Sequence, residues 1–431
     1  MSYELTATLI ILIIMMVMFI SNRFSFGGIA IMVICMLELS GVLTPKEAWN
    51  GLLNSSIPLV VSMFMLSAGL AKTSLLHKIT KIMVRPDAND RQLMTGIAIM
   101  CAFFSVFVNA TASVTLVTPL VYQVCRDTGR KPWQVFPAVG AICMITNGII
   151  PLGGNAGDFN LNNQMIENMG GTGVQTYFSN MIVLLPAAAI VTVFIIFTWQ
   201  YFAPKSGIDP EIDDLFDKKK LDAKISPGKE RLMYAIFVLS IVFMVYGTLS
   251  GRYSMYIPTC IGAFIMVSAG ICTVKEAHAS SQMSVIYLQI GSLAIGMALG
   301  KTGGTELIGE HVQRLLQGTQ NPRIVLAAFL IVPGLITQFM NNQAVNNVFK
   351  PIAISTALSM NLNATAYLLA THAAARAAML TPMSAPSQAI AMGAGGVTMK
   401  DYMKANIIPL LVWVTAYYIT APFMMSLTMP G

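Results

Sequence analysis

Two apolar stretches of this chain are each too long for one membrane span and are each interrupted at their centre by polar residues. They cover residues 92–126 and 323–360, and Asn109 and Asn341 stand at the interruptions, each ten residues before a proline. Backbone outside a helix is tolerated at membrane depth only where protein or a water-filled cavity surrounds it. We therefore expect two re-entrant helical hairpins, with their tips near the middle of the membrane and about 10 Å apart.

The two hairpins belong to a longer unit that occurs twice in the chain. The sequence TPKEA at Thr44 recurs as TVKEA at Thr273, and GLAKT at Gly69 recurs as ALGKT at Ala298. After each hairpin, another apolar run is interrupted, and we expect these two breaks to open at Pro151 and Pro382. A membrane chain with two halves of this kind is typical of a secondary transporter.

The composition indicates a protein that crosses the membrane many times. Of its 431 residues, 55% are hydrophobic and 10% are charged, whereas about 25% are charged in a typical soluble protein. We expect an all-α fold of two inverted repeats, each with five transmembrane helices, a hairpin and a broken helix. The first repeat covers 1–202 (broken helix 133–169) and the second 231–431 (broken helix 364–394), with a cytoplasmic linker at 203–230. The ten expected spans are 6–21, 26–42, 56–72, 133–150, 177–201, 231–249, 254–271, 283–300, 364–380 and 404–427.

The distribution of basic residues predicts the orientation. With both termini outside the cell, 19 of the 26 lysines and arginines fall in cytoplasmic loops and 5 in outer loops, as the positive-inside rule requires. The two halves are then inverted relative to each other, and the hairpins enter from opposite sides. Amphipathic stretches at Ser74 and Thr305 are expected to lie along the interface as helical arms.

The hairpin tips and the two breaks are the candidate binding site. The N-terminus of a half-helix favours an anion, and unwound carbonyls favour a cation. Neutral side chains at these places can donate to a carboxylate or accept around a cation; the alternatives are hydrogen bonds between helices and ordinary proline kinks. The candidates are Asn109, Thr111, Asn341, Asn342, Gln343, Asn346 and Asn347 at the tips, and Gly153, Gly154, Asn155, Ser384, Ser387 and Gln388 at the breaks.

A few ionisable residues in or near the apolar runs are further candidates, because charges inside a membrane are costly. Arg376 is the first choice to clamp an anion, unless it reaches the cytoplasmic face. Lys350 either supplies a fixed positive charge or extends outward. Asp158 binds a proton or sodium, pairs with a cation, or is a plain loop residue. His372 titrates or is simply packed, and Glu38 is expected at the interface.

The arrangement resembles the divalent anion:sodium symporter family within the ion transporter superfamily, over about 44–200 and 273–415. That family has Ser-Asn-Thr followed by a proline at each tip and a Pro/Gly-rich break downstream. The resemblance places Asn109-Ala110-Thr111 and Asn341-Asn342-Gln343 on the tips, and Pro151–Gly157 and Pro382–Gln388 on the breaks. It implies that these residues bind the anion, that sodium lies beside each tip, and that a homodimer works by an elevator motion.

The departures from that family pattern bear on coupling. Neither tip is Ser-Asn-Thr, and Lys350 and Arg376 add positive charge where sodium would lie. We therefore expect weaker sodium dependence than the family norm, with proton-linked transport or exchange in its place.

The predicted function is secondary active transport of a small anion, a di- or tricarboxylate, across the plasma membrane. The alternatives are proton-coupled or exchange transport of an inorganic oxyanion, and an anion channel. The chain has no HExxH or GxSxG motif, and its six cysteines form no CxxC pair, so we expect no enzyme, no disulfide framework and no cofactor beyond a sodium ion or proton. The net charge of +7 follows from the cytoplasmic loops and does not indicate nucleic acid.

Overall fold

The computed structural model describes most of the chain, and within the described residues it contains helices and no strand. It does not describe residues 1, 22–23, 54–55, 75–88, 108, 153–156, 208–224, 251, 255, 282, 316–320, 340, 383 and 429–431. The amphipathic stretch expected at Ser74 therefore lies almost wholly outside the described residues. The all-α prediction is confirmed.

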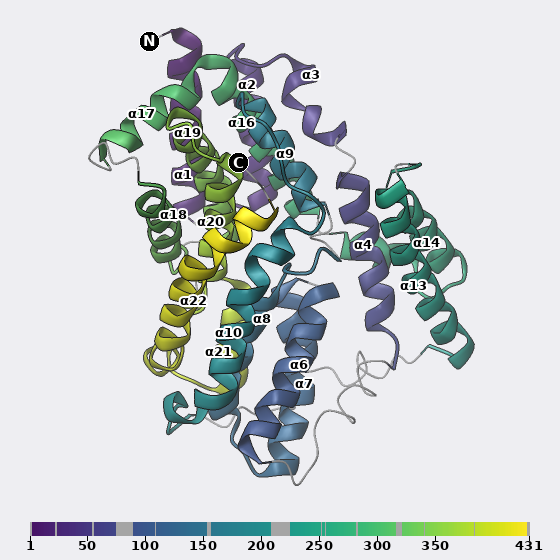
Figure 1. Ribbon diagram of the computed structural model, residues 1–431. Helices are drawn as coiled ribbons and strands as arrows, with labels where there is room; N and C mark the ends of the chain where they lie inside the picture. The colour runs from purple at the N-terminus through teal and green to yellow at the C-terminus, as the bar shows by residue number, and fades with distance from the viewer. Residues whose placement is uncertain are drawn as a thin grey trace.

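The helices of the N-terminal half and of the C-terminal half follow one another in the same order (Figure 1). Apart from α17 (Gly304–Leu315), which has no counterpart among the described residues of the first half, each half has two helices, a short helix, a third helix, a hairpin pair, a divided pair and a final long helix. The first half has α1 (Tyr3–Ser21), α2 (Phe26–Leu39), α3 (Pro45–Ala48), α4 (Ser56–Ala71), α6 (Asp90–Phe107), α7 (Ala110–Thr128), α8 (Pro132–Thr146), α9 (Asp158–Asn168) and α10 (Ser179–Phe202). The second has α13 (Pro227–Ser250), α14 (Tyr256–Ser268), α15 (Val274–Ser280), α16 (Met283–Thr302), α17 (Gly304–Leu315), α18 (Pro322–Ile336), α19 (Asn342–Ser359), α20 (Ala364–Arg376), α21 (Pro386–Gly395) and α22 (Met399–Thr428).

Both interrupted stretches are helix pairs, as expected. Residues 92–126 lie in α6 and α7, with Asn109 between them, and 323–360 lie in α18 and α19, with Asn341 between them. The arm expected at Thr305 is the helix α17, which packs against α19.

The prediction that prolines open the two downstream breaks was wrong. α8 ends at Thr146 and α20 ends at Arg376, five and six residues before the prolines. In the first break Asn147 is extended, and Gly148 then takes φ +64°, which suits a glycine and ends a helix without any proline. Pro151 and Pro382 therefore lie inside segments that are already unwound.

α8 is too short to cross a membrane by itself. Among the described residues, Ser179–Phe202 and Met399–Ser426 are long and apolar enough to cross a membrane, and other apolar helices are shorter. The 15 residues of α8 extend about 22 Å at 1.5 Å per residue, less than a hydrocarbon core of about 30 Å. Such a helix ends inside the membrane, which is where a broken helix places a binding site.

The two halves exchange their third long helices. α4 of the first half packs beside α14 and α13 of the second, around Leu59, Met63 and Leu66. In the same way α16 packs against α2 and α1. We call these six helices (α1, α2, α4, α13, α14 and α16) the frame. In Figure 1, α4, α13 and α14 stand together on the right, and α1, α2 and α16 lie at the upper left.

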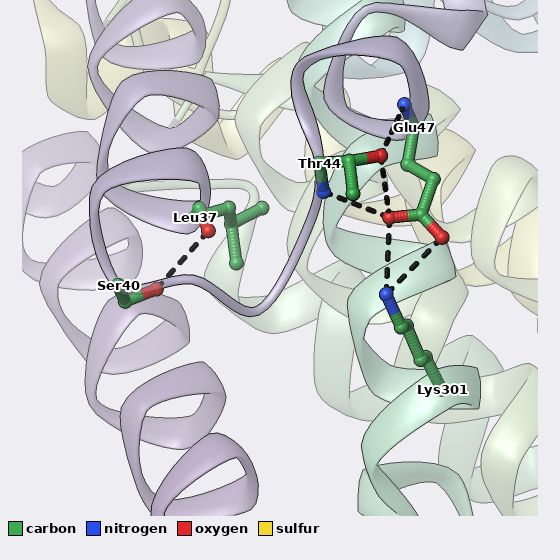
Figure 2. A network of polar contacts seen from close by, with 5 residues as sticks. All are labelled: Leu37, Ser40, Thr44, Glu47 and Lys301. Atoms are coloured by element: carbon green, nitrogen blue, oxygen red, sulfur yellow. Dashed lines mark hydrogen bonds and ion pairs between the residues drawn. The ribbon is translucent and has the colours of Figure 1, made fainter.

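Two ion pairs join the halves at equivalent positions of the frame. Glu47 accepts from Lys301 Nζ at 3.0 Å, and Glu276 accepts from Lys72 Nζ at 2.6 Å. Each glutamate also closes a capping box with the threonine three residues before it, Thr44 or Thr273. Figure 2 shows the first pair, with the Glu47 carboxylate held between Thr44 and Lys301.

These two contacts, which we call the clasps, use the repeated sequences TPKEA and GLAKT that the chain carries twice. The backbone N–H of Thr44 and then the Lys301 ammonium hold the pKa of Glu47 at about 2. Lys72 and then the Thr273 backbone hold the pKa of Glu276 at about 2. Each clasp joins residues that the charge distribution places on one side of the membrane.

The remaining long helices form a second group, which we call the body: α6–α10 and α18–α22. Its halves are also intermixed, since α21 packs against α7 and α8, and α10 packs against α22. The Tyr122 hydroxyl on α7 donates to the carbonyl of Ala394 on α21. The body therefore draws a hairpin and a broken helix from each half into one packed unit.

Candidate functional site

The two hairpin tips have the same local structure. Asn109 is the N-cap of α7, and its Oδ1 accepts from the backbone N–H of Ala112 at 2.9 Å. Asn341 is the N-cap of α19, and its Oδ1 accepts from Gln343 N at 2.9 Å. Asparagine is among the preferred N-cap residues because its side chain satisfies one of the free N–H groups there. Both asparagines thus mark helix N-termini, which attract anions.

In the second half, the hairpin tip is bound to its own broken helix by Gln338. The Gln338 Nε2 donates to Ala377 O at 2.8 Å, and its Oε1 accepts from Leu380 N at 3.1 Å. The side chain is 3% exposed, and Thr381 also donates to the Gln338 carbonyl. A neutral amide therefore satisfies the unwound backbone at this break.

In the first half, the hairpin and its broken helix are joined by Asn147 and Ser105. Asn147, the C-cap of α8, donates from Nδ2 to the carbonyl of Ser105 at 3.2 Å. Ser105 Oγ in turn donates to Cys143 O at 3.3 Å and shares a hydrogen bond with Ser113 Oγ at 2.9 Å. The unwound end of α8 is thus attached to α6 directly before the first tip.

Both tips converge on the break of the second half. The backbone N–H of Asn342 at the second tip donates to Ser384 O at 3.1 Å. Ala110 at the first tip forms a buried apolar cluster with Met144, Ala378 and Ala385. Because Ser384 and Ala385 are adjacent, the structure brings both tips to one place.

Arg376 lies at the join between the two broken helices. It is the last residue of α20 and is 6% exposed. Its Nε donates to the carbonyl of Asn147 at 2.8 Å, and its Nη1 donates to the carbonyl of His372 at 3.4 Å. Of the two alternatives for Arg376, the structure favours an inward position over one at the cytoplasmic face.

Lys350 also points inward. Its Nζ donates to Asn162 Oδ1 on α9 at 3.0 Å, and Asn162, 2% exposed, donates onward to Gln175 Oε1 at 3.1 Å. Asp158, one turn before Asn162, is 9% exposed and interacts electrostatically with Lys350 and Arg376. Asp158 is therefore the buried first residue of α9 and not a plain loop residue.

Some polar groups beside these charges have no partner. Both ring nitrogens of His372 and the Oδ1 of Asn346 are buried without a hydrogen bond. A buried polar group without a partner costs about 1–3 kcal/mol, so groups of this kind call for an explanation such as a bound ion or water. Their position next to Lys350 and Arg376 makes this cluster part of the candidate site.

Other predicted site residues lie apart from the tips or outside the described residues. Gln388 is fully buried between Gly140, whose carbonyl accepts from it at 3.1 Å, and Tyr402, whose hydroxyl donates to it at 2.7 Å. Ser387 is buried beside it, Gln343 is exposed, and Glu38 is half-buried near the end of α2. Asn347 donates to Gln343 O at 2.6 Å within α19, and Thr111 is half-buried in the first turn of α7. Gly153, Gly154 and Asn155 are not among the described residues.

Sequence reasoning missed Gln338, Asn147, Asn162 and Gln175. Gln338 and Asn147 directly adjoin the predicted tip and break, so polarity in an apolar run was a usable signal for them. Asn162 and Gln175 stand in a polar stretch that gives no signal of a site. Their role becomes visible only in the hydrogen bond of Asn162 to Lys350, 188 residues further along the chain. Within the described residues no cluster of His, Cys, Asp and Glu could hold a transition metal.

Paired hairpins, divided helices and polar tips together define an all-α membrane transporter. The citrate transporter family model matches residues 16–372 and 261–430, which together cover nearly the whole chain. The chain therefore belongs to the citrate transporter family, whose members are integral membrane transporters and not enzymes.

Known relatives and a solved structure are similar over different shares of the chain. The sodium-dependent dicarboxylate transporter SdcS of Staphylococcus saprophyticus is 19% identical over 94% of this chain and 83% of its own length. The uncharacterized transporter YfbS of Escherichia coli is 26% identical over 43% of this chain, which spans only 30% of YfbS. The Alcanivorax borkumensis YdaH transporter, described as having an unusual topology, has 13% identity and a TM-score of 0.62 over 90% of this chain and 88% of its own. At that identity the likeness shows the fold alone.

Proposed function

We propose that this protein is a secondary active transporter of a small carboxylate anion, a di- or tricarboxylate, in the plasma membrane. The observation that carries the proposal is the convergence of both hairpin tips on residues 384–385. Two half-helix N-termini from different halves then direct their partial positive charge toward one anion. The relatedness to a sodium-dependent dicarboxylate transporter supports the substrate class.

The anion is held mainly by neutral donors, with positive charge close by. Asn109 and Asn341 use their Oδ1 atoms for capping, which leaves their Nδ2 groups as donors. Arg376 supplies a fixed positive charge, and Lys350 and Asp158 are ionisable groups beside it. A positive charge in a low-dielectric site attracts a carboxylate strongly.

Alternating access follows from the division into frame and body. Gln338 and Asn147 fix each hairpin to its broken helix, and Arg376 connects the two broken helices. The body can then move as a unit relative to the frame, with the anion carried between the tips, in an elevator motion. We infer that the frames of two copies form the fixed part of a homodimer, as the resemblance to the divalent anion:sodium symporter family implies.

Transport into liposomes tests the proposal directly. Purified protein should take up radiolabelled succinate or citrate with saturation, and unlabelled substrate inside should accelerate uptake by exchange. Uptake that rises linearly with concentration and shows no exchange would mean a channel. Saturable uptake of sulfate or arsenite without carboxylate uptake would favour the second candidate, an inorganic oxyanion carrier.

Single cysteines at 109 and 341 test the geometry of the site. In a chain whose six natural cysteines are replaced, each tip cysteine should react only with reagents small enough to enter the binding cavity, and bound substrate should slow the reaction. Rapid labelling of residue 109 by an impermeant reagent from the outer solution, in a fixed inward-facing state, would show that α6 and α7 are two complete spans.

A further inference from the structure

The carbonyl of Asn147 stands at the C-terminus of a half-helix, a kind of group that coordinates coupling cations in transporters with broken helices. Unwound carbonyls and half-helix C-termini inside the membrane carry partial negative charge and coordinate sodium or a proton carrier. Asn147 is the C-cap of α8, so its carbonyl is such a group. In this protein that carbonyl accepts from Arg376 Nε at 2.8 Å.

The guanidinium is anchored at the ends of two half-helices at once. Arg376 ends α20, and its Nη1 returns to the carbonyl of His372 in the last turn of that helix. Its Nε reaches the end of α8. Because a cation at a helix C-terminus is stabilising, the side chain neutralises the partial negative ends of both broken helices.

Neighbouring groups keep the charge of Arg376 in place. Asp158 interacts electrostatically with the guanidinium, and Lys350 and His372 are the other ionisable groups in the cluster. Arginine remains protonated in proteins. At 6% exposure the Arg376 side chain is also largely shielded from solvent ions. The positive charge is therefore permanent and covalently attached.

We propose that Arg376 is a resident cation that takes the place of a coupling cation at the break of the first half. The inference rests on the proposed transport function and specifies its coupling. Since the position is already filled, the anion binds without an external cation at this half-site. The anion then crosses the membrane beside the positive charge of Arg376 and not beside a sodium ion. Exchange or proton-linked transport fits this arrangement.

Replacing Arg376 by neutral glutamine should open the position to a small cation. In choline buffer, uptake by Arg376→Gln should fall on the order of 10- to 100-fold, and sodium or lithium should restore most of it. Sodium should also raise the melting temperature of this variant in detergent and leave that of the unchanged protein unaltered. Arg376→Lys, which keeps the charge, should stay independent of sodium.

The matched control is Arg323→Gln, which removes an exposed arginine at the start of α18 and should change neither uptake nor its sodium response. Uptake by Arg376→Gln that is lost and is not restored by sodium or lithium would show that no cation position opens there, and would overturn the inference. If Arg376→Gln does not fold, sodium stimulation of Arg376→Lys by more than about twofold would also overturn it. Absence of carboxylate and oxyanion uptake by the unchanged protein would instead refute the proposed transport function.

Discussion

The two broken helices have the same order of elements, but different kinds of side chain bind the carbonyls at their unwound ends. At the first break, the C-terminal carbonyl of α8 accepts from a charged guanidinium, that of Arg376. At the second break, the carbonyl of Ala377 accepts from a neutral amide, that of Gln338. The carbonyl that ends α8 is therefore satisfied by a charged group and the carbonyl that follows α20 by a neutral one, although both breaks are built from a repeated unit.

This contrast shows which features of the repeat the fold requires and which are open to change. The N-caps Asn109 and Asn341 match, and so do the clasps at Glu47 and Glu276. Backbone geometry and the joining of the halves depend on these shared features. The side chains that bind the unwound carbonyls at the two breaks differ, a guanidinium at one and an amide at the other. These side chains can therefore change while the repeated backbone structure is kept.

The largest expected effect comes from removing the neutral group of the second break. Gln338→Leu leaves the N–H of Leu380 and the carbonyl of Ala377 buried without this partner. At about 1–3 kcal/mol for each unsatisfied group, we expect about 2–4 kcal/mol of lost stability and little remaining uptake. Thermal unfolding in detergent measures the loss, and liposome assays measure uptake.

Gln343→Leu is the matched control on the same hairpin, because Gln343 is exposed at the tip. It should lower stability by less than about 0.5 kcal/mol. If the two leucine variants melted at the same temperature, Gln338 would not be holding the second break to its hairpin, and the contrast between the breaks would fail.

The smallest expected effect is at the clasps. Glu47→Gln keeps the capping box, in which glutamine can replace glutamate, but removes the charge that pairs with Lys301. Because Lys301 and Glu47 are both partly exposed, solvent screening limits the loss to about 1 kcal/mol or less. Glu276→Gln should behave alike at the other clasp, since its pair with Lys72 is similarly exposed.

The pKa of Glu47 is lowered from 4.5 to about 2. This pKa also fixes how the stability difference between Glu47→Gln and the unchanged protein depends on pH. A lowered carboxyl pKa contributes stability that is fully present above the unfolded value and is lost as the pH falls toward 2. The difference in melting temperature between Glu47→Gln and the unchanged protein should therefore be constant from pH 5 to 8. A clasp that weakened between pH 8 and 6 would contradict this assignment.

Local sequence patterns predicted the helices well and the long-range contacts poorly. The interruptions at Asn109 and Asn341 were recognisable because a cluster of polar residues at the centre of a long apolar run marks a place where the backbone can leave the helix. The ends of α8 and α20 were predicted too late in the chain, because Pro151 and Pro382 are stronger helix-breaking signals than Asn147 and Gly148, which end α8.

The candidate site was predicted in its residue types and only partly in its contacts. Arg376, Lys350 and Asp158 were identified because charges in apolar runs are rare. Their partners could not be read from the sequence: Asn147 lies 229 residues from Arg376, and Asn162 lies 188 residues from Lys350. Gln388 has the polarity of a binding residue, but the packing of α21 against α8 uses it between Gly140 and Tyr402.

The central claim is that resident positive charge at the first break lessens the need for sodium. The most direct measurement is carboxylate uptake by the unchanged protein in liposomes, in sodium and in choline buffers, at several pH values between 5.5 and 8. We predict uptake rates in the two buffers within a few-fold of each other, with a clear dependence on pH or on internal substrate. Uptake that vanishes in choline and ignores pH would contradict the claim and would place sodium at the tips despite Arg376 and Lys350.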